Sequence, residues 1–116
     1  MGNRRKGNRG EDVALRYLLS RKLDLVERNY RTRYGELDLV MRDAGTLVFV
    51  EVKWRGGLEY GAPVEAVTER KQRAIRSMAE QYLAEKEPEF EEIRFDVVGI
   101  LARTGENAIQ HVRHAF

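Results

Sequence analysis

The segment "GELDLVMRDAGTLVFVEVKW", residues 35–54, constrains the fold more than any other part of the chain. Two apolar-rich stretches in it alternate in polarity, as strands do, and a polar, glycine-containing break at residues 43–46 separates them. We therefore predict an antiparallel hairpin closed at that break. Its register would give four facing pairs, which are Arg42 with Leu47, Val40 with Phe49, Asp38 with Glu51, and Glu36 with Lys53.

Side chains alternate between the two faces of a strand, so all eight of these residues are expected on one face. The opposite face would then be purely apolar and would build the core. Its members would be Leu37, Leu39, Met41, Val48, Val50 and Val52. The hairpin is thus predicted to carry its charges on one face and the core on the other.

Asp38 and Glu51 are the unusual pair, because their Cβ atoms would lie about 5 Å apart. Like charges in that arrangement repel and raise each other's pKa. A divalent cation, Mg²⁺ or Mn²⁺, would offset the repulsion, with the backbone carbonyl of Val52 as a further oxygen ligand. Lys53 would lie beside a water bound to that cation, an arrangement suited to cleaving phosphodiesters. The alternative is a solvated ladder of ion pairs on an exposed sheet face.

The rest of the chain predicts helices on either side of this hairpin. Apolar spacing indicates a first helix over residues 11–22 and a strand from about Leu25. A long second helix is capped by Thr68 and ends before Pro88. The nearly apolar residues 94–101 predict a buried strand parallel to the second strand of the hairpin, and residues 108–116 a short last strand or tail.

We therefore predict an α/β fold of order αβββαβ plus a short C-terminal strand, with a mixed sheet flanked by helices on both faces. A length of 116 residues fits a single domain, residues 1–116, and the basic residues 1–9 are expected to form a flexible segment ahead of the first helix.

Two inward-pointing charges extend the candidate site. Glu11 and Lys71 are each in phase with the apolar stripe of their helix, near its N-terminal turn. A single polar pocket could hold both, together with Glu36 and the carboxylates of the hairpin. The alternatives are that Glu11 compensates the helix dipole and that Lys71 extends its stem over apolar surface.

Basic residues are unevenly distributed along the chain. Residues 1–33 hold ten Lys or Arg against four Asp or Glu, and 16 of the 21 basic residues are arginine. Arginine binds phosphates bidentately, so this distribution is what a protein with a polyanionic partner would show. The alternative, which this signal alone does not separate from it, is a merely solvated surface. The candidates for nucleic-acid contact are Arg31, Arg33, Arg55, Arg70 and Arg73.

Composition excludes several other classes of site. The chain has no cysteine, which rules out disulfides, thiolate metal sites and cysteine nucleophiles. No stretch is apolar enough to span a membrane, and the basic N-terminus does not lead into a signal peptide, so we expect no membrane association and a cytoplasmic protein. A homodimer is compatible with the sequence.

The hairpin resembles the PD-(D/E)XK nuclease superfamily, in which an acid on one strand and a Glu-X-Lys on the next form a metal site. Asp38 matches the first acid and Glu51-Val52-Lys53 the remainder. Six ordered blocks resemble the YraN-type family of small bacterial proteins over nearly the whole chain. The blocks are "GNRGEDVALRYL", "RNYRTRYGELDLV", "VFVEVKWR", "GAPVEAVTERKQRAI", "RFDVVGI" and "HVRHAF". The resemblance implies a restriction-endonuclease-like fold similar to that of archaeal Holliday-junction resolvases, with Glu11 near the metal.

Other residues carry weaker signals. His111 and His114 have metal-pair spacing only if they are helical, and Asp96 in a buried strand favours a structural hydrogen-bonding role. Trp54, Tyr60 and Tyr34 could stack on bases, although Trp54 alternates onto the core face.

Three functions remain open from the sequence. The first is a divalent-metal-dependent nuclease acting on DNA, with Asp38, Glu51 and Lys53 as its catalytic residues. The second is a nucleic-acid-binding protein that keeps the nuclease fold with little or no catalysis. The third is a small scaffold that binds protein partners through its charged patches. The retained Asp38, Glu51 and Lys53 favour the first function, and the arginine-rich N-terminal third favours either of the first two.

Overall fold

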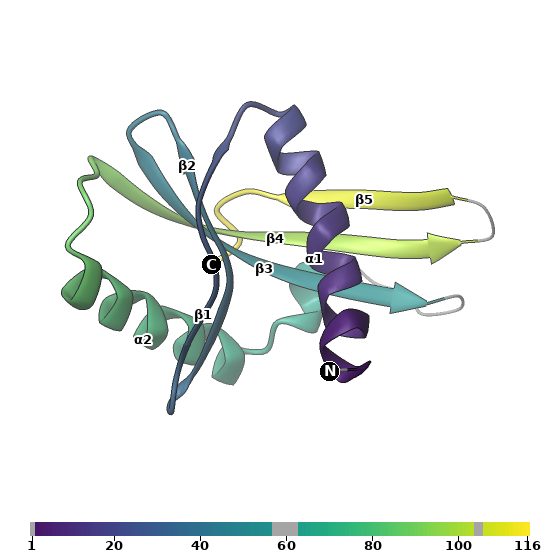
Figure 1. Ribbon diagram of the computed structural model, residues 1–116, viewed down its shortest axis with the longest axis horizontal. Coiled ribbons are helices and arrows are strands. Elements are labelled where there is room, and N and C mark those ends of the chain that lie inside the picture. The colour runs from purple at the N-terminus through teal and green to yellow at the C-terminus, as the bar shows by residue number, and fades with distance from the viewer. Residues whose placement is uncertain (1, 57–62, 104–105) are drawn as a thin grey trace.

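A five-stranded sheet and two long helices form this mixed α/β protein (Figure 1). The computed structural model describes residues 2–56, 63–103 and 106–116, with side chains for residues 9–54, 65–101 and 108–116. The elements in order are α1 (Gly2–Ser20), β1 (Asp24–Thr32), β2 (Gly35–Asp43), β3 (Thr46–Gly56), the 3-10 turn η1 (Pro63–Ala66), α2 (Glu69–Lys86), β4 (Glu92–Arg103) and β5 (Glu106–Val112). Neither helix, over the part of the chain described, is long and apolar enough to cross a membrane.

The strands lie in the sheet in their sequence order, from β1 to β5. Only β3 and β4 run parallel, and all other neighbours are antiparallel. The predicted parallel crossover from β3 through α2 to β4 is therefore confirmed. Residues 57–62, between β3 and η1, lie outside the described residues. The glycine-rich sequence of residues 55–63 predicts a loop there.

The predicted hairpin register is confirmed next to the turn. The β2–β3 ladder pairs Asp43 with Thr46, Arg42 with Leu47, and so on to Leu39 with Val50. Ala44 in the turn has a φ of 55°, the left-handed value that tight hairpin turns require. The closing turn thus sets which residues face each other over this half of the hairpin.

Both faces of the sheet are apolar there, and each is covered by one helix. Val40, Leu47 and Phe49 pack with Ile75 and other residues of α2. The alternate residues Leu39, Met41, Val48 and Val50 pack with Ala14 and Leu18 of α1. The expectation that only one face of the hairpin builds the core is therefore wrong, because α2 covers the other face up to the charged residues.

Leu37 is on the side of the sheet opposite to the predicted one. It belongs to the cluster around α2, with Tyr30, and not to the cluster that holds Leu39. The neighbouring strand β1 has a register shift between Leu25 and Glu27, and Asn29 takes a left-handed φ of 56° between the residues that pair with Leu39 and Leu37. The tip of the β1–β2 hairpin packs against α2.

Helix α1 starts earlier than the sequence predicted. It begins at Gly2, so the basic residues 1–9 are almost wholly helical and do not precede the helix as a separate segment. Arg and Lys are good helix formers, and the region has no proline. Gly10 permits close packing on Trp54 of β3, because a Cβ at Gly10 would lie 3.1 Å from Trp54 Cε3. Trp54 thus packs against α1 as expected, but it remains 43% exposed and is not part of the buried core.

The ends of α2 follow the prediction. Thr68 is the N-cap, and its Oγ1 accepts a hydrogen bond from the amide of Lys71 at 3.2 Å. Glu87 closes the helix in a left-handed conformation, directly before Pro88. These caps fix the position of the first turn of α2, which carries Lys71.

Asp96 of β4 is completely buried and accepts hydrogen bonds from several directions. Arg94 donates to both of its carboxylate oxygens, at 2.9 and 3.1 Å, and His111 Nε2 lies 2.7 Å away. The amide of His114 also donates to it, at 3.3 Å. Arg94 and His111 together lower the pKa of Asp96. The expected structural role of Asp96 is confirmed, and it ties β4 to β5 and to the C-terminal residues.

Replacing Asp96 should therefore cost much stability. In Asp96→Ala the buried guanidinium of Arg94 loses its main partner, so we expect a loss of about 3–5 kcal/mol in the free energy of unfolding. Asp43→Ala removes the other, half-exposed carboxylate of the same arginine and should cost less than about 1 kcal/mol. Urea unfolding of both variants measures the difference. Equal costs would contradict the role of Asp96.

Candidate functional site

Beyond the pair Leu39 and Val50, the ladder between β2 and β3 stops. The backbone amide of Val52 donates instead to Oδ2 of Asp38, at 2.9 Å. On its other edge β3 stays paired with β4, where Glu51 faces Val97 and Lys53 faces Gly99. The predicted facing pairs Asp38–Glu51 and Glu36–Lys53 are therefore wrong as ladder pairs, because a side chain of β2 has replaced its backbone as the acceptor.

The carboxyl groups of Asp38 and Glu51 nevertheless interact where the two strands part. Burial raises the pKa of Asp38, and the nearby charge of Glu36 adds to this. Burial and the charge of Asp38 raise the pKa of Glu51 to about 7. A hydrogen bond from the protonated Glu51 carboxyl to the Asp38 carboxylate stabilises the pair when one proton is shared. At neutral pH this pair holds less negative charge than two ordinary carboxylates would.

Two lysines approach the same oxygen of Glu51. Lys53 Nζ lies 3.6 Å from Glu51 Oε2, and Lys71 Nζ lies 3.7 Å from it. Lys53 comes from β3 itself, whereas Lys71 comes from the first turn of α2, as its phase in the helix predicted. The side chain of Glu51 is only 7% exposed, but those of Lys53 and Lys71 are 29% and 48% exposed. The ammonium groups therefore lie between a buried carboxyl group and the solvent.

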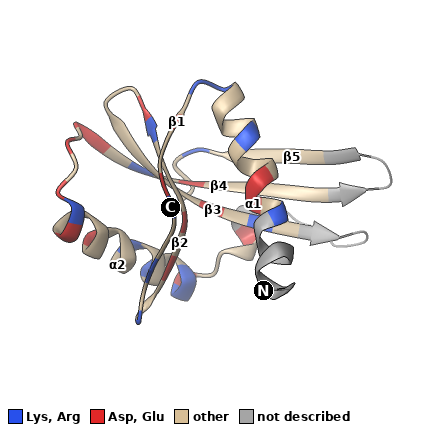
Figure 2. Cartoon of the chain, in the orientation of Figure 1, with Lys and Arg blue, Asp and Glu red and all other residues tan. Residues whose placement is uncertain are grey.

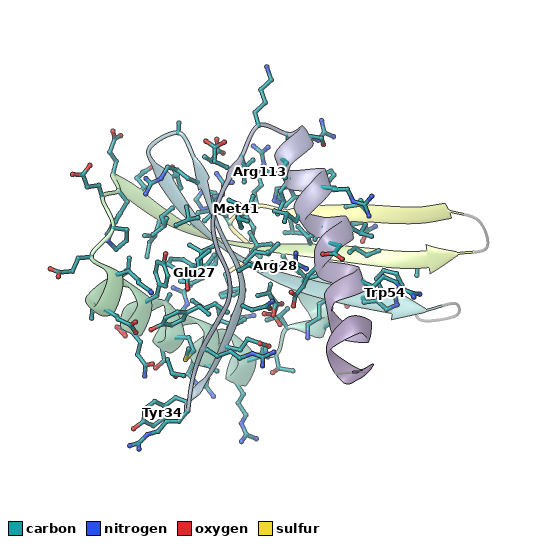
Figure 3. All side chains as sticks on the ribbon, viewed as in Figure 1. Glu27, Arg28, Tyr34, Met41, Trp54 and Arg113 are labelled. Carbon is teal, nitrogen blue, oxygen red and sulfur yellow. The ribbon has the colours of Figure 1, made fainter. Side chains whose placement is uncertain are left out.

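Glu11 approaches the site from the opposite face of the sheet, on α1. Its side chain is 12% exposed and pairs with Arg28 of β1 at 3.4 Å. Burial raises the pKa of Glu11, and the charge of Asp38 raises it further. Arg28 also binds Asp12 at 2.5 Å, and it points from β1 toward α1 (Figure 3).

Sequence reasoning missed Arg28. The sequence could have indicated it. Strand β1 pairs antiparallel with β2, and Arg28 faces Leu39, whose side chain lies on the α1 side of the sheet. Pairing these two strands from the sequence would have placed a cation beside Glu11. Glu36, the other expected carboxylate, pairs with Arg31 at 2.5 Å and still acts on the pKa of Asp38 and Glu11 through its charge.

Among the side chains that the structure describes, no three His, Asp or Glu residues are grouped so as to hold a metal ion by themselves. A pair of acidic side chains, Asp38 and Glu51, forms the centre of the site. Mg²⁺ commonly takes one or two carboxylates from a protein and fills its remaining positions with water or substrate phosphate. The pair thus has the donor chemistry of such a site, with other oxygens needed to complete it.

The arginines predicted to contact nucleic acid are spread over two elements on the same side of the molecule. Arg31 and Arg33 are exposed at the end of the β1–β2 hairpin, and Arg70 and Arg73 are exposed on α2. Figure 2 shows positive residues at the hairpin tip and on α2 beside it. The side chains of Arg55 and Tyr60 lie outside the described residues.

The fold and the site define a small mixed α/β protein with a buried pair of carboxyl groups, bordered by lysines, where two strands separate. Comparison with known proteins places the chain in a family. The family described as "Uncharacterised protein family UPF0102" matches residues 10–100, and the chain belongs to it. This is the family indicated by the YraN-type blocks of the sequence.

Relatives from distant bacteria match over almost their full length. The chain is 50% identical over 111 residues to a UPF0102 protein of Rhodococcus opacus, covering 95% of this chain and 94% of the relative. It is 46% identical over 114 residues to a UPF0102 protein of Syntrophomonas wolfei, covering 98% and 99% of the two chains. A UPF0102 protein of Dictyoglomus turgidum is 44% identical over 101 residues, or 87% and 86% of the chains.

The raised pKa of Glu51 makes stability depend on pH. Because the folded state binds this proton more tightly than the unfolded chain does, the stability it contributes is present below pH 4.5 and is lost as the pH rises toward about 7. In chelator, the melting temperature of Glu51→Gln minus that of the wild type should therefore increase as the pH rises from 5 to 8. Glu80→Gln, on the exposed side of α2, controls for the loss of one charge. A difference between Glu51→Gln and wild type that stays constant with pH would contradict this prediction.

Proposed function

We propose that this protein is a divalent-metal-dependent nuclease that hydrolyses phosphodiester bonds of DNA, with a restriction-endonuclease-like fold. The observation that supports this most is the buried Asp38–Glu51 pair with Lys53 and Lys71 at its solvent side. Two carboxyl groups placed together at the cost of desolvation and repulsion are typical of sites that bind a cation. The resemblance of this hairpin to nucleases with an acid followed by Glu-X-Lys points to the same chemistry.

Mg²⁺ or Mn²⁺ fits the donor chemistry of this pair. Both ions prefer carboxylate oxygens, and Asp38 and Glu51 supply them from neighbouring strands. Val52 would add its backbone carbonyl, and Glu11 a carboxylate from α1. When bound, the ion would supply positive charge against the scissile phosphate and would lower the pKa of an attacking water.

The residues of the chain itself then have separate roles. Lys53 is the catalytic cation, which orients the attacking water or stabilises the charge that develops on the phosphate oxygens. Lys71 offsets the charge of Glu51 from the α2 side and holds the Glu51 side chain in place. Arg28 restrains Glu11 on the α1 side, where the charge of Glu11 is felt by Asp38. Glu36 adds negative charge at the edge of the site.

DNA is the proposed substrate because exposed arginines lie on two elements beside the site. Arg31, Arg33, Arg70 and Arg73 are suited to phosphate contacts that position the backbone without reading sequence. Arg55 follows Lys53 on β3 and is a further candidate. Such a protein would act in the cytoplasm, where chromosomal DNA of a bacterial cell lies.

A specific observation favours the second candidate, a DNA-binding protein with little or no catalysis. Lys53 and Lys71 both approach Glu51 within 4 Å, so two ammonium groups already offset part of its charge. Cations of the protein could in that case stabilise the carboxyl pair without any metal. Binding of DNA through the arginines would not depend on the pair at all.

Cleavage of DNA distinguishes the two candidates. We expect labelled duplex, single-stranded or four-way-junction DNA to be cut in Mg²⁺ or Mn²⁺ and not in chelator. Asp38→Asn and Lys53→Met should each lower the cleavage rate by about 100-fold or more, because they remove a ligand and the catalytic cation. Lys86→Met, a lysine at the far end of α2, is the matched control and should cut normally. Binding without cutting by the wild type would support the second candidate.

Metal binding can also be measured without any substrate. Mg²⁺ at 100 times its dissociation constant should stabilise the folded wild type by about 2.7 kcal/mol, seen as a higher melting temperature. Asp38→Asn should lose most of this increase, whereas Lys86→Met should retain it. A wild type that melts at the same temperature with Mg²⁺ and with chelator would contradict the metal site.

A further inference from the structure

The turn between β1 and β2 exposes an aromatic ring at the end of a projecting hairpin (Figure 3). Tyr34 is 66% exposed, the highest value among the large hydrophobic side chains that the structure describes. An aromatic ring in water loses the favourable burial that such side chains usually have. Its exposure at the tip therefore suggests a partner that offers a flat surface.

Local contacts hold this ring in place. The guanidinium carbon of Arg33 lies 5.0 Å from the centre of the Tyr34 ring, and Arg33 Nη2 donates to Tyr34 Oη at 2.8 Å. The amide of Tyr34 donates to Oγ1 of Thr32 at 3.0 Å. Arg33 and Tyr34 thus form one stacked unit, which we call the tip platform. A preformed platform loses little conformational entropy when it binds.

The hairpin below the platform is fixed to α2. Thr32 Oγ1 donates to Met78 Sδ at 3.4 Å, and a Cβ added to Gly35 would lie 3.3 Å from Met78 Cγ. Farther down the hairpin, the hydroxyl of Tyr30 donates to Glu85 at 2.6 Å. The platform is therefore held at a set position relative to the carboxyl pair. Asp38 lies four positions after Tyr34, which is about 13 Å along a strand.

The surface around the platform is positive. Arg33 and Arg70 form no ion pair with any carboxylate in the described part of the chain, and both are exposed. Arg73 is also exposed, on the side of α2 that faces Ile93 and Phe95. Arg31 is also exposed, although Glu36 neutralises part of its charge. An exposed aromatic ring that carries one guanidinium, with further exposed arginines on α2, matches the chemistry of single-stranded nucleic acid, which presents phosphates and unstacked bases together.

We propose that the tip platform stacks on an unpaired base, so that the substrate is DNA with unpaired nucleotides adjoining a duplex. This inference rests on the proposed function, because it takes nucleic acid to be the partner. In an intact duplex both faces of every base are already stacked on neighbours, and Tyr34 would have no surface to bind. An unpaired base exposes its face, and stacking on Tyr34 covers the ring and the base at once. The arginines of α2 then contact the backbone that leads toward the carboxyl pair.

Binding to matched DNAs tests the proposal. The probes are a fully paired duplex and the same duplex with a three-nucleotide gap, whose middle unpaired base is 2-aminopurine. Titrations by fluorescence anisotropy are made in chelator, so that no cleavage occurs. We expect the wild type to prefer the gapped DNA and to quench the 2-aminopurine. Tyr34→Ala should reduce that preference by about 5- to 150-fold and abolish the quenching.

Two variants control the comparison. Tyr34→Phe keeps the ring and should retain both the preference and the quenching. Phe90→Ala removes another exposed ring, from the loop after α2, and should behave like the wild type. Both Tyr34 variants should melt at the temperature of the wild type, because the side chain is exposed.

The outcomes separate this proposal from the proposed nuclease activity. Equal affinity of Tyr34→Ala and wild type for the gapped DNA would overturn the stacking role, even if the wild type cuts DNA. A preference that depends on Tyr34 would support it, even if no DNA is ever cut. An equal loss of affinity for both DNAs would mean a contact with the backbone only, and absence of binding to either DNA would overturn the proposal as well.

Discussion

The backbone amide of Val52 donates to the carboxylate of Asp38, and the arrangement of the site depends on this hydrogen bond. In an intact ladder that amide would bond to a backbone carbonyl of β2, and the sheet would separate its two faces completely. Here β2 moves away from β3, while β3 stays paired with β4. The opening allows charges from both faces to act on one pair of carboxyl groups. From the α1 side Glu11 and Asp38 repel each other, and from α2 Lys71 reaches Glu51.

Local sequence signals predicted the parts of this arrangement that are set by neighbours along the chain. The turn at Ala44 and Gly45 fixes the register near it, and Thr68 and Pro88 bound α2. The end of the β2–β3 ladder depends instead on which partner β3 keeps. That partner is β4, which begins only at Glu92, after β3 has ended at Gly56 and the chain has passed through α2. In the sequence, the alternation of polar and apolar residues continues through Glu36 and Lys53. This pattern therefore predicts that the β2–β3 ladder also continues to these residues. Sequence therefore predicted that the acids come together, but placed them as opposed residues in a regular sheet.

The other differences also arise from contacts distant in sequence or from a single backbone angle. Leu37 packs on the α2 side and pairs with Tyr30, which directly follows the left-handed residue Asn29, and a residue's φ is not visible in a pattern of polarity. Arg28 meets Glu11 only because β1 lies at the edge of the sheet under α1. Asp96 could be recognised as a structural residue, since an acid in a buried strand must find hydrogen-bond donors. Its particular donors, Arg94 and His111, required the position of β5.

Charge balance explains why this opening in the sheet can coexist with a stable core. Asp38 and Glu51 would repel strongly if both were ionised while buried, yet the pKa of Glu51 at about 7 lets a proton offset the repulsion near neutral pH. Lys53 and Lys71 offset it further from the solvent side. A proton and the lysines thus both neutralise the same two groups, and the proposed divalent cation would compete with them. Since a cation must displace the proton, its affinity for this pair would rise with pH, and the two lysines would be freed to act on whatever anion approaches.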